Sequence, residues 1–328
     1  KIKSEIRNQL IMKQVPYENN LLDCNKNLQL VKNAVKKNLG VSLPFLTDIA
    51  HYMVTPHNNQ TRSLVLLQSA SLFDDPDDDI IDIGSTLEYL HTASALHRNI
   101  KEPEKARRHL QQVQNLWGSE AAILLGDYLL SISFQILVKV GNLDVLECVS
   151  LATQNIARGQ VLEVSEPPLT ATPKHWRRVT RDKIAGLFGA GAQSAAYWGK
   201  SSEATASTLF DFGMHVGMAV QLKTELAAVE DEKLFQQKLK KQDLWSPLCS
   251  LLHDCMPPNE SMELSDKLLN EFDVPEMFTK LGYLFKKYEV SEKVHSEAEL
   301  ELREAKECLE RLELDSAQLQ PLTQYSMI

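Results

Sequence analysis

The sequence predicts an all-α protein built as a bundle of antiparallel helices. In nearly every segment, apolar residues recur three or four positions apart, the spacing that places them on one face of a helix. No stretch alternates strictly between apolar and polar residues, and a chain of 328 residues with only 13 Gly and 13 Pro favours long helices over turns. We expect about ten or more helices in a single domain that spans residues 1–328.

Helix-breaking residues divide the chain into successive helical segments. Clear helical spacing occurs within 28–39, 83–90 and 143–149, and the breaks fall at Gly40 with Pro44, 56–59, 74–79, Pro103, Gly141, 167–168 and 257–258. Residues 184–199 carry no charge and are rich in Gly and Ala. Such a segment is typical of a central helix that neighbours contact closely on all sides.

Two segments are expected to be more exposed, and one apolar segment is expected to be buried. Residues 233–241 are polar and basic, and a charged helical region covers about 285–328. Residues 121–140 are strongly apolar but include Asp127, Gln135 and Lys139. These polar residues favour a buried helix over a transmembrane one.

Composition narrows the classes of function. With 43% hydrophobic and 24% charged residues the chain resembles an ordinary soluble protein, and its net charge of −9 argues against nucleic acid as a partner. The five cysteines are scattered, which predicts free thiols and a reducing compartment. The acidic run 74–79 is interrupted by Pro76 and is expected to be a solvated loop.

An ordered series of motifs resembles the trans-isoprenyl diphosphate synthases. The matching positions run in the family's order: Leu96 and His97; Arg107 and Arg108; Leu124, Gly126 and Asp127; Gly159 and Gln160; Lys183 and Leu187; Phe212, Gly213 and Gln221. No one of these motifs would suffice, but the set keeps family-like spacing from about residue 28 to about residue 230. The resemblance implies the isoprenoid synthase fold, an antiparallel bundle around a central cleft.

The chain departs from this family where magnesium would bind. The family's first aspartate motif falls on Arg98, Asn99 and Glu102, and its second on Thr224, Glu225 and Ala228. Six aspartates with a formal charge of −6 are thus replaced by residues whose formal charge is −1. A guanidinium about 4 Å from a divalent cation repels it by several kcal/mol at a protein surface. We therefore expect no catalytic residue, no metal and no cofactor bound by this chain.

The diphosphate-contact positions are partly retained. The family's early basic motif keeps only Arg62, because its lysine and first arginine fall on Asn59 and Gln60. Arg107, Arg108 and Lys183 match further contact positions, so Arg62, Arg107, Arg108 and Lys183 are candidates for residual diphosphate binding. Retention as helix-surface ion pairs remains an equal alternative.

The string LHRNI at residues 96–100 resembles the degenerate motif of the subunit 2 group of heteromeric decaprenyl and solanesyl diphosphate synthases. This resemblance implies a non-catalytic subunit whose obligate partner, subunit 1, keeps intact aspartate motifs and holds Mg²⁺, in a heterotetramer. It further implies access to isoprenoid diphosphates through that partner, synthesis of the ubiquinone side chain, a mitochondrial location and peripheral association with membranes.

Two other functions fit parts of the sequence. Glu88 with His91 and Glu292 with His295 have the Glu-x-x-His spacing of di-iron helical bundles, although the second pair lies among solvated charges. Alternatively, the chain is an autonomous prenyl-binding lyase with Lys223 and Glu225 as base and acid.

Overall fold

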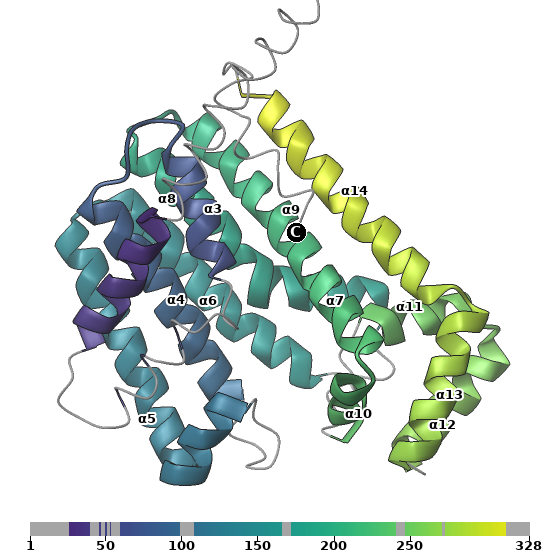
Figure 1. Ribbon diagram of the computed structural model, residues 1–328. Coiled ribbons are helices and arrows are strands. Elements are labelled where there is room, and N and C mark those ends of the chain that lie inside the picture. The colour runs from purple at the N-terminus through teal and green to yellow at the C-terminus, as the bar shows by residue number, and fades with distance from the viewer. Residues whose placement is uncertain are drawn as a thin grey trace, which may run out of the picture.

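A computed structural model of the chain describes residues 26–39, 46, 50, 53, 60–98, 108–165, 172–240, 247–270 and 273–312. These residues contain helices and no strand, which confirms the predicted all-α class (Figure 1). A first helix covers 26–39. It is followed by α3 (Thr61–Ala70), α4 (Asp78–Arg98), α5 (Arg108–Val140), α6 (Leu143–Ser165), α7 (Pro173–Thr180), a π-helical turn η3 (Arg181–Ala185), α8 (Gly186–Trp198), α9 (Glu203–Glu230), α10 (Glu232–Lys240), α11 (Pro247–Cys255), α12 (Pro258–Asn270), α13 (Val274–Lys287) and α14 (Val290–Glu310).

The uncharged Gly/Ala-rich segment forms α8, and it is central as predicted. Ten of its thirteen residues are buried, and α3, α6 and α9 pack around it. Gly213 of α9 explains how close the helices come, because a Cβ atom at this position would lie 2.5 Å from the carbonyl oxygen of Phe188. Gly213 of α9 and the small residues of α8 therefore let the two backbones come into direct contact.

The helix α14 runs along α9 (Figure 1). The buried face of α14 consists mainly of small and apolar residues, including Val290, Val294, Ala298 and Ala305, while its charged residues are mostly exposed. The described part of the C-terminal region is therefore amphipathic, with one exposed face and one that belongs to the core.

Glu301 is the one buried charge on α14. It accepts hydrogen bonds from Arg177 Nη1 at 2.6 Å and His215 Nδ1 at 2.7 Å, so it links α14 to both α7 and α9. Burial alone would raise the pKa of Glu301, but these two hydrogen bonds and the positive charges behind them hold it below its usual value.

The prediction that residues 121–140 are a buried helix is wrong for one face of α5. Leu125, Leu129 and Leu137 are buried, and α5 packs along α4. Leu124 and Val138 are instead 68% and 67% exposed. By length and composition alone, residues 120–140 could also cross a membrane, and only 44% of the apolar window is buried.

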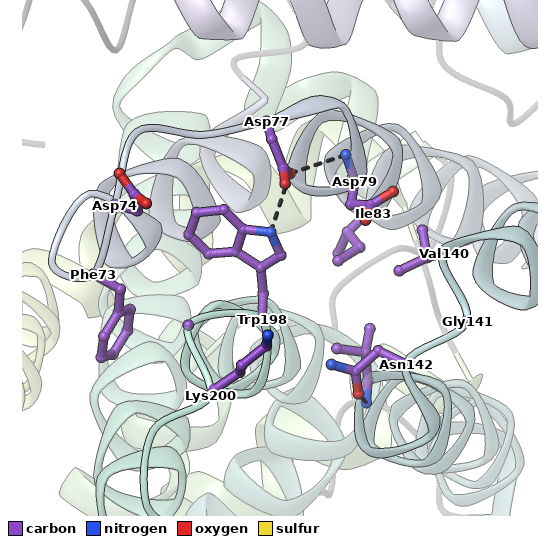
Figure 2. A pocket seen from close by; sticks show the side chains of 12 residues that line it. Phe73, Asp74, Asp77, Asp79, Ile83, Val140, Gly141, Asn142, Trp198 and Lys200 are labelled. Atoms are coloured by element: carbon purple, nitrogen blue, oxygen red, sulfur yellow. Dashed lines mark hydrogen bonds between the residues drawn. The ribbon is translucent and has the colours of Figure 1, made fainter.

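The acidic run ends in a helix cap. Residues 74, 75 and 77–79 are exposed, as a solvated loop requires. Asp77 caps α4 by accepting from the backbone N–H groups of Asp79 and Ile80, and its carboxylate also accepts from Trp198 Nε1 at 3.0 Å (Figure 2). Burial, followed by the neighbouring charges of Asp77 and Asp82, raises the pKa of Asp79. Asp77, Asp79 and Trp198 border a pocket of about 630 Å³ where α4 begins and α5 and α8 end.

The four cysteines within the described residues carry free thiols, as predicted. Cys148, Cys249 and Cys308 are buried, and burial raises the pKa of Cys148 to about 12. Cys24 lies outside the described residues.

Candidate diphosphate site

The positions that match the family's first motif fall at the C-terminal end of α4. Arg98 is the last residue of that helix, and its side chain lies outside the described part of the chain. Asn99, Glu102 and Arg107 are also outside it, and Arg108 is described only as the backbone that begins α5. The roles predicted for these residues therefore remain predictions.

His97 connects this end of α4 to α5. Its Nε2 atom lies 3.3 Å from Asp127 Oδ1 and 3.4 Å from the carbonyl oxygen of Ile123. The imidazole occupies the space next to Gly126, where a Cβ atom would come within 2.2 Å of Nε2. The matched glycine and aspartate of α5 thus have a local explanation, since one leaves room for the matched histidine and the other pairs with it.

Lys183 lies on the π-helical turn η3 and is paired with a carboxylate. Its side chain is only 7% exposed, and Nζ donates to both carboxylate oxygens of Glu163 on α6, which is 14% exposed. The sequence predicted Lys183 as a diphosphate contact but did not single out Glu163. Any anion that binds Lys183 must compete with this internal partner.

A second ion pair, between Arg158 and Asp182, holds η3 against α6. Asp182 is buried and accepts from Arg158 through Nε and Nη2, both at 2.9 Å. Two residues further along α6, Gln160 Nε2 donates to the backbone oxygen of Ser94 at 2.9 Å. The matched Gln160 therefore links α6 to α4 close to the first motif.

Arg62 is enclosed in a network between α3 and α4. The residue is 8% exposed, with Nη1 3.7 Å from Glu88 Oε2 and Nη2 3.3 Å from His91 Nε2. Its guanidinium lies over the ring of Phe188 at 5.2 Å. Glu88 also accepts from the hydroxyl of Ser63 at 2.8 Å. The structure therefore places Arg62 in an internal network rather than at an open surface.

The second motif offers a single carboxylate. Thr224 is exposed and its hydroxyl donates to the carbonyl oxygen of Val220 at 2.7 Å, while Ala228 is buried and apolar. Glu225 is 8% exposed and accepts from Gln221 Nε2 at 2.7 Å. Among the described residues no group of three or more His, Cys, Asp or Glu side chains could hold a metal ion. The residues present at this motif do not fit a magnesium site.

The same finding counts against a di-iron centre in the described part of the chain. Glu88 already belongs to the Arg62 network, and His295 pairs with Glu299 at 3.1 Å on an exposed face of α14.

The lyase alternative used Lys223 as its base. Lys223 is half-buried one residue before Thr224.

Comparison with known proteins places the chain in a family. The family model described as polyprenyl synthetase matches residues 43–272. The chain therefore belongs to the polyprenyl synthetase family, and the predicted isoprenoid synthase fold is confirmed.

Relatives of known sequence agree with this placement. Octaprenyl diphosphate synthase of Escherichia coli is 28% identical over 199 residues, which cover 60% of this chain and 61% of that protein. A prenyl transferase of Cyanophora paradoxa is 25% identical over 94% of this chain and 97% of its own. The match to the first of these relatives thus spans less than two thirds of its length.

Solved structures share the fold over nearly the whole chain. A decaprenyl diphosphate synthase from Rhodobacter capsulatus superimposes with a TM-score of 0.80 at 21% identity, covering 95% of this chain and 97% of that one. A polyprenyl synthase from Caulobacter crescentus, complexed with calcium and isoprenyl diphosphate, gives a TM-score of 0.84 at 18% identity, covering 94% and 95%.

Proposed function

We propose that this chain is the non-catalytic subunit of a heteromeric trans-polyprenyl diphosphate synthase, an enzyme that extends an allylic diphosphate with isopentenyl diphosphate. The observation that carries the proposal is the loss of acidic oxygens from a family fold that is otherwise kept. Of six positions that match aspartates in the family, Glu102 and Glu225 alone are acidic, and one of the other four is Arg98.

Electrostatics explains why this loss ends catalysis. Departure of pyrophosphate from the allylic substrate needs divalent cations to neutralise the charge that develops on its oxygens. Mg²⁺ takes oxygen ligands and depends on a few carboxylates to stay bound. The second motif supplies Thr224, whose hydroxyl donates to the carbonyl oxygen of Val220, and Glu225, which is already hydrogen-bonded to Gln221. Its third position, Ala228, has no side-chain ligand atom.

Lys183 and Arg62, which match diphosphate-contact positions, also support a structural role for this chain. Lys183 pairs with Glu163 and Arg62 pairs with Glu88, so internal carboxylates neutralise both cations at predicted diphosphate positions. These pairs stabilise the packing of α3, α4, α6 and η3 against one another. A chain with these pairs keeps its shape without a ligand and can complete an oligomer.

The proposed partner is a catalytic subunit with intact aspartate motifs, which would hold Mg²⁺ and bind the isoprenoid diphosphates. A heterotetramer, the ubiquinone side chain as the use of the product, a mitochondrial location and peripheral membrane association belong to this proposal. The sequence string LHRNI at residues 96–100 is what supports these finer points.

The test compares turnover of the isolated chain with turnover of the complex. Purified chain incubated with Mg²⁺, an allylic diphosphate and isopentenyl diphosphate should form no product, whereas co-expression with the catalytic subunit should give a stable complex more active than that subunit alone. Product length is measured by chromatography of the dephosphorylated polyprenols. Turnover by the isolated chain would overturn the proposal.

A carboxylate-restored variant provides the positive control for metal binding. It places aspartate at all six motif positions, namely Arg98, Asn99, Glu102, Thr224, Glu225 and Ala228. Isothermal titration should detect Mg²⁺ binding in the presence of inorganic pyrophosphate for this variant and none for the natural chain. Equal Mg²⁺ binding by both chains would contradict the electrostatic argument.

A further inference from the structure

A thiol and an amine from different helices are in direct contact where α11 ends and α14 begins. Cys255 is the last residue of α11, and Lys293 lies on the first turn of α14. Lys293 Nζ donates a hydrogen bond to Cys255 Sγ at 2.9 Å, between residues that are 38 positions apart in the chain. The two helices pack against each other, so the packing of the fold holds the two side chains together (Figure 1).

The pairing of Lys293 with sulfur is unusual, because a thiol is a weak hydrogen-bond acceptor. Asp254 and Glu289 also act on this ammonium, yet in the described part of the chain no ion pair joins Lys293 to a carboxylate. The pKa of Lys293 is raised, first by its hydrogen bond to Cys255 and by its attraction to that sulfur, while the two carboxylates contribute less. Sulfur is therefore the main partner of this ammonium.

Solvent can reach Cys255, unlike the other cysteines among the described residues. Those three are buried, whereas Cys255 is half-buried and Lys293 is exposed. Cys308 provides a comparison within the same chain, because Arg311 Nη2 donates to its sulfur at 3.0 Å but the residue is 0% exposed. Cys255 thus combines a cationic donor with access to a dissolved reagent, and Cys308 has the donor without the access.

A disulfide within α11 is excluded by distance. Cys249 lies six residues before Cys255 on this helix, which places the two Cα atoms about 9 Å apart. A disulfide spans no more than about 7 Å between Cα atoms. The amine of Lys293, in contrast, already touches the sulfur.

These features are those of a cysteine that peroxides oxidise. A cation beside a thiol favours the thiolate, and thiolate character together with exposure decides which cysteines are oxidised. In this reaction the Cys255 sulfur attacks one oxygen of hydrogen peroxide and the O–O bond breaks. The products are the sulfenic acid of Cys255 and one molecule of water, so that sulfur loses two electrons and the peroxide gains them.

We propose that Cys255 and Lys293 form a peroxide-sensitive site, at which the sulfenic acid of Cys255 condenses with the amine of Lys293 to give a sulfenamide bond. The ammonium gives one proton to the sulfenic hydroxyl, which leaves as water. Nitrogen then forms the N–S bond and releases a second proton to the solvent. Hydrogen peroxide is the only oxidant consumed, and two molecules of a thiol reverse the bond by forming their own disulfide.

The sulfenamide bond would tie α11 to α14 and close a loop that contains α12 and α13. Ion pairs already join α12 to α13, so this helix pair would be fixed as a unit beside α14. A cross-link stabilises a fold chiefly by restricting the unfolded chain, and we expect the oxidised chain to melt roughly 5 °C above the reduced one. The bond also keeps the sulfur from the irreversible sulfinic stage.

The test treats the purified full chain with a small molar excess of hydrogen peroxide, alkylates the remaining thiols and maps the digest by mass spectrometry. The expected product is a pair of peptides joined through Cys255 and Lys293, two hydrogen atoms lighter than the separate peptides, which dithiothreitol separates. Cys308 should be recovered as an alkylated thiol. Recovery of Cys255 as a thiol, or as a sulfinic acid without the cross-link, would overturn the proposal.

Two variants of Lys293 separate its charge from its amine. Lys293→Arg keeps a cation beside the sulfur, so Cys255 should oxidise at about the natural rate but stop at a sulfenic acid that dimedone traps. Lys293→Met also removes the charge and should slow the oxidation about 10-fold. Both variants should melt like the natural reduced chain, because Lys293 is exposed.

The matched control is Lys306→Met, which removes another exposed lysine of α14 and should change neither the rate nor the cross-link. Equal oxidation rates for Lys293→Met and the natural chain would show that the ammonium does not activate the sulfur. A cross-link at Cys255 that persists in Lys293→Arg would show that Lys293 is not its nitrogen. Either result would refute the site.

Discussion

Replacing Glu163 by Gln tests whether the Glu163 carboxylate prevents an external anion from binding to Lys183. The side chains of Lys183 and Glu163 are 7% and 14% exposed, so the variant leaves a buried ammonium without its charged partner. Removing one member of a buried pair costs about 3–5 kcal/mol. Because the ammonium can release its proton instead, the cost at neutral pH cannot exceed about 4.6 kcal/mol, taking about 1.36 kcal/mol for each unit below its ordinary pKa.

We therefore expect Glu163→Gln to lower the free energy of unfolding by about 3 kcal/mol or more in urea titrations at neutral pH. Inorganic pyrophosphate should then recover much of this loss, because a ligand at 100 times its Kd stabilises by about 2.7 kcal/mol. The natural chain should gain far less from the same ligand.

The control removes an exposed ion pair. Lys139 is 78% exposed in its pair with Asp82, and Lys139→Gln should cost no more than about 1 kcal/mol and create no response to pyrophosphate. A similarly small cost for Glu163→Gln, with equal pyrophosphate shifts in variant and natural chain, would refute the reasoning.

Two further predictions concern the packing around α9. Gly213→Ala should destabilise the chain by about 3 kcal/mol or more in urea, because the added Cβ would lie 2.5 Å from the backbone oxygen of Phe188; a cost below about 1 kcal/mol would mean that α8 and α9 separate easily. Glu301 contributes stability above its unfolded pKa because its folded pKa is lowered, and this contribution should be lost as pH falls through the folded pKa, below about 4.5. Glu301→Gln should consequently be less stable than the natural chain at pH 7, with the gap closing in acid; a gap independent of pH would show that the ionised carboxylate at Arg177 and His215 is not its cause.

Local chemistry explains which parts of the fold could be predicted. Helical spacing and the scarcity of breakers predicted the all-α class, and the absence of charge in residues 184–199 predicted the buried central helix, which the structure confirms as α8. Each of these depends on neighbours within a few positions along the chain. The loss of the motif aspartates could also be predicted from the sequence, because the motif is defined by residue types at positions a fixed number of residues apart.

Hydropathy alone could not distinguish a buried helix from one with an uncovered face. Residues 121–140 were predicted to be buried, yet Leu124 and Val138 of α5 are largely exposed. The apolar residues on both faces of α5 contribute equally to the mean hydropathy of the segment. Only the packing of α5 against α4 reveals which face is covered.

By itself, the sequence determined the helical class, the family and the replacement of aspartates by residues such as Arg98 and Ala228. Only the tertiary structure decided that Lys183 is paired with Glu163 and Arg62 with Glu88, since these partners are 20 and 26 positions apart. Charge pairing between helices depends on how their surfaces meet, and that geometry follows from the packing of the whole core rather than from any local pattern.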